Sequence, residues 1–249
     1  MTRPAAQNIL RIIGFLAAQS GPVTASRITQ ALKLPRSTVY DLLSVAIGQG
    51  YAIHIPEKRR YALGLRAFEL GSGFQRQQPL VLLATPLLKR LVSDTRLSAH
   101  LAVLHGNDVI YLVEERTRQG PWLVSDVGVR LPAHLTATGR AILAHLPPAQ
   151  LRALYPSSKL ELVLRTSDGP SSIGELRRVL STTRRRGYAL EHNEVTEGLA
   201  SIARPVFDRT GWPIASVALT GSHRTVSTQL DQLTPLVSSV AAKLSHRAT

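Results

Sequence analysis

Cysteine is absent from the 249 residues of the sequence. Its absence excludes a disulfide framework, a thiolate metal site and a cysteine nucleophile. Long apolar runs are also missing, because the most apolar stretch, residues 80–88, is too short to span a bilayer and contains Thr85 and Pro86. The first residues, MTRPAAQN, lack the apolar core of a signal peptide. We therefore expect a cytoplasmic protein with no membrane partner.

Spacings that mark common metal and catalytic sites are lacking as well. No HExxH pattern and no glycine-rich phosphate loop occurs, and His134, His192 and His223 follow no ligand spacing. We interpret His134 as a hydrogen-bonded structural histidine. Glu191, His192 and Glu194 could hold an adventitious zinc ion, but a solvated polar turn explains them better. No Ser/His/Asp triad can be assigned, because hydroxyls and histidines are common. We expect no catalysis, no metal and no cofactor.

Acidic residues are scarce: 16 stand against 30 lysines and arginines, which gives a formal net charge of +14 and a pI near 11.1. Residues 1–78 hold ten basic and three acidic residues, and the rest hold twenty and thirteen. Each part therefore carries +7, but the first is less than half as long. A dense basic charge suits phosphate binding. Arginine-rich genomic composition would produce the same bias, so charge alone does not decide the partner.

Residues 24–51 contain two short helical patterns separated by a four-residue turn. Thr24 is a good N-cap for the first helix, and Pro35 suits the first turn of the second. The second helix has one apolar face at the spacing i, i+3, i+4, i+7, i+8, formed by Val39, Leu42, Leu43, Ala46 and Ile47. The pattern indicates a helix-turn-helix, with a helical hairpin in a core as the alternative.

The flanking segments favour the helix-turn-helix. Within residues 9–17, apolar side chains recur at the same helical spacing, which predicts the third helix that such a unit needs. Residues 51–55 alternate like a strand, residues 56–60 form a basic turn, and Tyr61 and Leu63 begin a return strand. Three helices and a basic hairpin predict a winged helix-turn-helix. Its expected partner is double-stranded operator DNA, contacted by the second helix and the wing. The expected contact residues are Arg36, Ser37, Thr38, Tyr40, Asp41, Ser44, Lys58, Arg59 and Arg60.

The remainder of the chain predicts an α+β domain whose strands pair in hairpins. We expect a DNA-binding domain at residues 1–64, a linker helix at residues 65–77 and a second domain at residues 78–249. Gly71, Ser72 and Gly73, where the linker helix should end, mark the expected domain boundary. Pro86 should kink or restart the first helix of the second domain. The expected strands are residues 99–104, 109–113, 122–127, 188–191, 199–207 and 214–220, and the expected helices are residues 80–91, 138–145, 149–154, 173–186 and 228–245.

Two of the expected strands carry small and hydroxylic residues on one face. Period-two alternation groups Leu199 with Ser201, and Ala218 with Thr220. Such side chains, where a core would want valine or isoleucine, suggest a cavity with hydrogen-bonding walls. A less buried sheet face is the alternative.

Three further segments resemble the IclR family. LPAHLTATGRAILA at residues 131–144 is similar to the signature that opens the central helix of the family's ligand-binding domain. EGLASIARPVFDRTGWPIASVAL at residues 197–219 resembles the second signature, and YALGLRAFELG at residues 61–71 resembles the wing-to-linker segment. With the helix-turn-helix, the resemblance covers nearly the whole chain in the family's order.

The resemblance implies a transcriptional regulator with a winged N-terminal domain and a GAF-like, antiparallel-sheet domain that binds a small effector. It also implies a homodimer or homotetramer, and we expect a repressor rather than an activator. Asp41 stands where the family commonly has a basic residue, and Ser201 where it often has cysteine. The expected effector-binding residues are Leu123, Leu131, Ala137, Thr138, Gly139, Glu191, Leu199, Ser201, Ala218 and Thr220.

The effector we expect is a small, mostly apolar carboxylic acid or derivative, aromatic or not. Thr138 and Gly139 should open a helix whose unpaired N–H groups face an anion. Two other classes remain open. A small-molecule-binding enzyme or sensor with an appended nucleic-acid domain would turn over its ligand, and an architectural DNA protein would bind DNA regardless of sequence.

Overall fold

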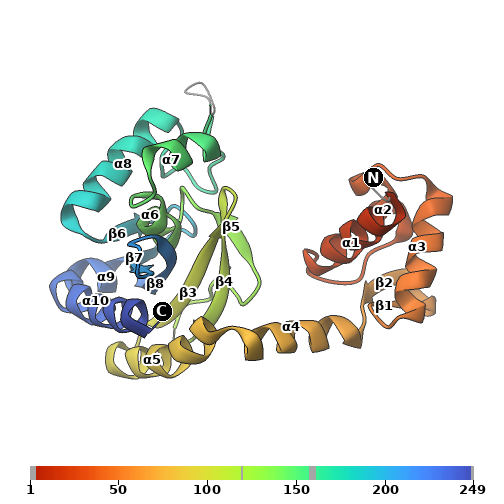
Figure 1. Cartoon of the computed structure of the whole chain (residues 1–249), viewed down its shortest axis with the longest axis horizontal. Coiled ribbons are helices and arrows are strands. Elements are labelled where there is room, and N and C mark those ends of the chain that lie inside the picture. The colour runs from red at the N-terminus through yellow and green to blue at the C-terminus, as the bar shows by residue number, and fades with distance from the viewer. Residues whose placement is uncertain (1–3, 119, 157–160, 248–249) are drawn as a thin grey trace. The chain divides into compact units, whose positions relative to one another are not determined.

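The computed structural model of the chain describes residues 4–118, 120–156 and 161–247. These fall into two compact units, residues 1–77 and residues 78–249 (Figure 1). In the described part of the chain, no helix is both long and apolar enough to cross a membrane.

The first unit is a three-helix core with a two-stranded antiparallel sheet. Thr24 caps the second helix by accepting a hydrogen bond from the backbone N–H of Arg27. Ile12, Ile28 and Val39 are fully buried between the helices. Ile47, expected in this core, is instead 37% exposed, because the buried face of its helix ends one residue earlier at Ala46. The elements are α1 (Pro4–Ala17), α2 (Ala25–Leu32), α3 (Arg36–Gly48), β1 (Ala52–Ile55), the 3₁₀ turn η1 (Pro56–Lys58) and β2 (Arg60–Leu63).

Helix α4 (Leu65–Gln77) follows the hairpin without the break expected at Gly71-Ser72-Gly73. Glycine lowers helix propensity by about 1 kcal/mol relative to alanine, which does not interrupt a helix with good formers on both sides. No other heavy atom lies within 4 Å of where a Cβ of Gly71 would stand, so this glycine meets no close-packing demand.

The second unit contains a six-stranded antiparallel sheet in the order β5-β4-β3-β8-β7-β6. The expected hairpins are confirmed: β3 pairs with β4 across the turn at Gly106, and β7 pairs with β8 across the turn at Gly211. The strands are β3 (Ser98–His105), β4 (Asp108–Glu115), β5 (Arg130–Pro132), β6 (Ala189–His192), β7 (Leu199–Phe207) and β8 (Pro213–Ser222).

Helices cover both faces of this sheet (Figure 1). Helices α5 and α10 pack on one face, where Leu101, Ile202 and Leu219 are fully buried. Helix α6 lies on the other face, with α8 against it. Helix α5 passes Pro86 as one continuous helix rather than restarting. The helices are α5 (Pro79–Thr95), α6 (Ala137–Leu143), α7 (Pro148–Leu154), α8 (Ile173–Arg186), α9 (His223–Thr228) and α10 (Leu230–Arg247).

The strand expected at residues 122–127 is wrong. This segment is irregular, and the place beside β4 at the sheet edge belongs to β5. Its Leu123 and Ser125 are nevertheless buried, at 4% and 8% exposure. The segment has an apolar pattern because it covers the α6 side of the sheet. A loop that covers a sheet and a strand at its edge both alternate apolar and polar residues, so the sequence pattern does not distinguish them.

Candidate functional site

Helix α3 presents a polar face on the surface of the first unit. Arg36, Ser37, Tyr40, Asp41 and Ser44 are exposed, whereas Thr38 is half-buried. The Arg36 guanidinium lies 5.7 Å from the centre of the Tyr40 ring, so these two side chains form one surface feature at the start of the helix. The arrangement offers an arginine and short hydrogen-bonding groups at an accessible helix N-terminus.

The wing places its three basic residues differently. Lys58 and Arg59 are exposed at the tip, where Arg59 adopts a left-handed backbone conformation (φ 47°). The Arg60 side chain turns back and donates a hydrogen bond to the carbonyl of Pro22 at 3.1 Å. Beside this contact, Val23 and Tyr61 form two backbone hydrogen bonds with each other. Arg60 therefore helps attach the hairpin to the helices, a contact that sequence patterns do not reveal.

Strand register in the second unit aligns polar side chains across the α6 face of the sheet. Glu191 of β6 pairs with Ser201 of β7, which pairs with Thr220 of β8. The hydroxyls of Ser201 and Thr220 are 2.9 Å apart, so they hydrogen-bond to each other. Three neighbouring strands thus contribute a continuous polar row.

The adjacent row is made of alanines on the same three strands. Ala189, Ala203 and Ala218 pair across β6, β7 and β8, and Ala137 and Ala141 of α6 pack on them. Small side chains on both sides allow the helix to approach the sheet closely. Helix α6 therefore fills the space above the alanine row and leaves the polar row as the floor of a cavity at its N-terminal end.

Nine of the ten residues expected to bind an effector line this one cavity. The exception is Gly139, which packs against backbone: a Cβ there would lie 2.2 Å from the carbonyl oxygen of Ala133. This glycine sets how closely α6 meets the preceding turn, and it contributes nothing to the cavity wall. The nine lining residues are Leu123, Leu131, Ala137, Thr138, Glu191, Leu199, Ser201, Ala218 and Thr220.

At the start of α6, one of the N–H groups expected to face an anion is already paired. The helix begins at Ala137, and Thr136 caps it by accepting a hydrogen bond from the N–H of Gly139 at 3.0 Å. The Thr138 hydroxyl is also without a hydrogen-bond partner among the described residues, and it is buried in the cavity wall. An unpaired buried hydroxyl costs free energy unless a bound molecule or water satisfies it.

Glu191 closes one end of the cavity and also fixes the loop after β6. One of its carboxylate oxygens accepts hydrogen bonds from the backbone N–H groups of Glu194, at 2.9 Å, and Val195, at 3.1 Å. Burial raises the pKa of Glu191 to about 7, because removal from water disfavours the charged form more than these hydrogen bonds favour it. This carboxyl is therefore partly protonated near neutral pH.

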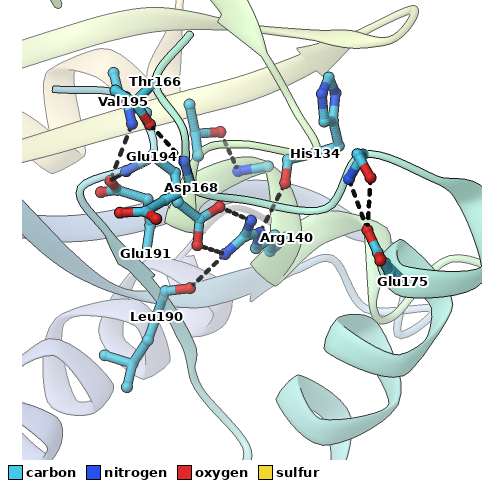
Figure 2. A network of polar contacts seen from close by, with 12 residues as sticks. His134, Arg140, Thr166, Asp168, Glu175, Leu190, Glu191, Glu194 and Val195 are labelled. Atoms are coloured by element: carbon cyan, nitrogen blue, oxygen red, sulfur yellow. Dashed lines mark hydrogen bonds and ion pairs between the residues drawn. The ribbon is translucent and has the colours of Figure 1, made fainter. Parts of the chain in front are cut away.

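The same loop is held from α6 by a buried arginine (Figure 2). Arg140 forms a two-pronged ion pair with the carboxylate of Glu194 and donates to the carbonyls of His134, at 2.7 Å, and Leu190, at 3.0 Å. Val195, next in the loop, lines the cavity. Arg140 thus links the helix, the edge strand and the cavity wall.

Sequence reasoning missed six polar residues at the site: His100, Tyr111, Glu114, Ser125, Thr136 and Thr196. His100 and Tyr111 line the cavity, and Glu114 lies behind His100 in the neighbouring strand. The available signal was a histidine at an inward position of an otherwise apolar strand, SAHLAVLH. By contrast, His134 is structural as interpreted, with Nε2 2.9 Å from the carbonyl oxygen of Val163.

His192 and His223, the other histidines considered, lie close together with ring centres 5.0 Å apart. No group of three or more histidine, aspartate or glutamate side chains in the described part of the chain could hold a metal ion.

Comparison with known proteins agrees across both units. Residues 5–52 match the family model for the IclR helix-turn-helix domain, and residues 75–246 match the one for bacterial transcriptional regulator IclR C-terminal. The chain is 32% identical to the HTH-type transcriptional regulator BhcR of Paracoccus denitrificans, over 95% of this chain and 84% of that protein. It is 28% identical to the transcriptional repressor IclR of Escherichia coli, over 85% and 77%.

A solved structure with a similar fold carries a small molecule. It is that of an IclR homologue from Microbacterium hydrocarbonoxydans complexed with 4-hydroxybenzoate, which has a TM-score of 0.82 and 22% identity and covers 98% of this chain and 100% of its own. The two family matches and the relative at 32% identity establish the conclusion: the chain belongs to the IclR family of DNA-binding transcriptional regulators.

Proposed function

We propose that this protein is a cytoplasmic homo-oligomeric repressor whose affinity for operator DNA is controlled by a small carboxylic acid bound beside α6. The observation that carries the proposal is the cavity itself. Its floor is the polar row of Glu191, Ser201 and Thr220, and its apolar wall is formed by Leu123 and Leu131. A mostly apolar wall with a few convergent polar groups suits a small ligand with polar ends.

The DNA-binding role rests on α3 and the wing. Arg36 and Tyr40 lie together at the start of the exposed helix, where they would meet base edges and phosphates of a major groove. Lys58 and Arg59 at the wing tip would contact the DNA backbone or minor groove. Asp41 on the same helix repels phosphates but can accept a hydrogen bond from a cytosine amino group, so it would tune the operator sequence.

The experiment identifies the DNA first and then the ligand. DNA fragments that copurify with the protein are sequenced, and the affinity for the enriched fragment is measured with and without a panel of metabolite acids. We expect at least one acid to change DNA affinity severalfold, since a regulatory ligand must bind the two functional states unequally. Failure of every acid to bind or to shift DNA affinity would overturn the proposal.

Two variants locate the acid in the cavity. Ser201→Leu should abolish its binding by filling the floor, and Thr138→Val should weaken it about tenfold by removing one hydrogen bond. Thr234→Val is the matched control, because Thr234 lies in α10 on the other side of the sheet and its hydroxyl is already bonded to the carbonyl of Leu230. Unchanged acid binding by both cavity variants would place the ligand elsewhere.

A further inference from the structure

The cavity needs a positive group if its ligand is an anion, and its wall offers one candidate. Among the described residues that line it, His100 alone has a side chain that can carry a positive charge. The only carboxyl in that wall is Glu191, which cannot attract an acid. Arg140 lies nearby, but its guanidinium is already bonded to Glu194 and to two backbone carbonyls.

The strand register places His100 in a defined environment. His100 of β3 pairs with Ala218 of β8 on one side and with Glu114 of β4 on the other, so it extends the alanine row. Both the imidazole and the Glu114 carboxyl are almost completely buried, with side-chain exposures of 3% and 2%. The imidazole Nδ1 lies 3.3 Å from a carboxylate oxygen of Glu114. The two atoms lie close without forming a hydrogen bond. Since Nδ1 faces Glu114, Nε2 is the nitrogen available to a molecule in the cavity.

Glu114 is kept ionised by its other contacts. Its second oxygen accepts a hydrogen bond from the Arg116 side chain at 2.5 Å, and Arg116 also donates to the carbonyl of Ser125 at 2.7 Å. Although burial raises the pKa of Glu114, the nearby imidazole of His100 and the bonds from Ser125 and Arg116 lower it further, to below its ordinary value. The buried Glu114 carboxylate therefore lies where it can stabilise an imidazolium that forms when an anion binds.

The free hydroxyl of Thr138 lines the same cavity as His100. Tyr111 of β4 lies beside His100, its ring edge-on at a centre-to-centre distance of 5.5 Å. Together they give an anion a cationic donor, a hydroxyl donor and an aromatic edge.

We propose that His100, as an imidazolium in contact with the Glu114 carboxylate, binds the acid group of the effector through Nε2. Glu191 accepts a hydrogen bond from a polar group at the opposite end of the ligand. This inference rests on the proposed function and specifies the orientation of the ligand. Two strands separate β3 from β6, so the strands that carry His100 and Glu191 lie about 14 Å apart across the sheet. Both side chains line the same cavity, so a ligand held between them has its acid group toward β3 and a polar hydrogen toward β6.

The groups facing His100 determine how binding depends on pH. Glu114 and Tyr111 face it from β4, Glu191 lies across the cavity on β6, and Arg116 stands behind Glu114, while β8 contributes the neutral Ala218. Binding an anion to a neutral imidazole must take up a proton. Acid affinity should therefore fall as pH rises above neutrality, whereas the affinity of an uncharged analogue should not.

The experiment compares acids with their primary amides, which have nearly the same shape without the charge. The probes are benzoate, 4-hydroxybenzoate, phenylacetate and pyruvate, each with its amide, measured by titration calorimetry at pH 7.5 in phosphate and in Tris buffer. We expect wild type to prefer the acid it binds to the corresponding amide by at least tenfold and to take up a proton on binding it. His100→Asn should lose about ten- to a hundredfold in acid affinity, keep its amide affinity and lose the proton uptake.

Three further measurements keep the test decisive. Glu191→Gln removes the other group that could bind the proton, and its proton uptake should remain. Glu114→Gln should weaken acid binding without changing amide binding. This variant replaces His100→Asn in the test if His100→Asn does not fold. Thermal unfolding without ligand checks both variants.

The inference is overturned if wild type binds acid and amide alike, or if His100→Asn binds the acid as tightly as wild type. Absence of any acid binding would overturn the proposed function as well, so the two failures are distinguishable.

Discussion

The carboxyl of Glu191 is buried at the edge of the sheet, where two backbone N–H groups and the Ser201 hydroxyl stabilise its charge. Its pKa is raised to about 7 from an ordinary value of 4.5. Between these values the folded protein keeps a proton that the unfolded chain releases. The folded state therefore binds more protons there, and the contribution of Glu191 to stability falls as pH rises from about 4.5 to about 7.

Glu191→Gln isolates this effect. Glutamine keeps an oxygen for the N–H groups of Glu194 and Val195 but stays neutral at every pH. Relative to wild type, the variant should gain roughly 2–3 kcal/mol in free energy of unfolding between pH 5 and pH 8. Urea unfolding of both proteins at four pH values in this range measures the difference. A difference that stays constant with pH would mean that the carboxyl is ionised throughout.

The second residue-scale prediction concerns the buried ion pair of Arg140 and Glu194. Arg140→Met leaves the Glu194 carboxylate without its partner and the carbonyls of His134 and Leu190 without a donor. We expect a loss of about 3–5 kcal/mol in free energy of unfolding, and weaker effector binding because Val195 lines the cavity.

The matched control is Arg178→Met. The Arg178 side chain is 79% exposed and its guanidinium lies 3.9 Å from the carboxylate of Glu175, so its loss should cost less than about 0.5 kcal/mol. Equal costs for the two variants, measured by urea unfolding, would show that burial does not strengthen the α6 ion pair.

At the scale of elements, the wing combines a DNA-facing role with an attachment role. Arg59 is exposed at the tip, whereas the Arg60 side chain bonds to the carbonyl of Pro22. Arg59→Ala should lower the salt slope of binding to a mixed-sequence duplex by about one, the effect of one lost phosphate contact. Arg60→Ala should change the slope less and should destabilise the first unit instead.

Arg90→Ala controls for the change in net charge, because its side chain is 84% exposed in α5 of the other unit. The salt slope is obtained from DNA affinities at several salt concentrations, and the stability of each variant from a thermal unfolding curve. A larger slope change for Arg60→Ala than for Arg59→Ala would reverse the two assignments.

Elements whose signals are local are predictable from the sequence. Helix α8 ends at Gly187, in a left-handed conformation after three arginines, because helix-ending chemistry lies within a few adjacent residues. Strands β7 and β8 follow from alternation and a tight turn, and the same alternation places Ser201 opposite Thr220. Most of the cavity floor could therefore be predicted.

Features that depend on contacts between distant segments are not predictable in this way. The pairing of His100 with Glu114 depends on a register that shifts between Leu101 and Ala102, which no single strand encodes. The close backbone of Ala133 requires glycine at position 139. A ligand approaching the backbone would require the same residue, so the sequence cannot distinguish the two causes. For the same reason, the segment at residues 122–127 has a strand-like pattern although it is a loop.

At the scale of the whole molecule, the first unit exposes apolar side chains that its own core does not use. Ile12 and Leu16 of α1 are buried in that core, whereas Leu10 of the same helix is 70% exposed. In α4, Leu65 and Phe68 are each 72% exposed and share one side of the helix. The structure thus separates core residues from candidate interface residues, which the sequence alone left mixed.

We predict that this surface mediates self-association. A single small winged domain contacts too few base pairs for high specificity, so paired half-sites and a dimeric or tetrameric protein are expected. Replacing both Leu65 and Phe68 with serine should weaken association at least tenfold, since two large apolar side chains would otherwise leave water. Sedimentation velocity over a range of micromolar concentrations measures it. Leu82→Ser, at an exposed leucine of α5, is the control and should associate as wild type does. A double variant that still assembles like wild type, or a wild type that binds its operator as a monomer, would exclude this surface as the interface.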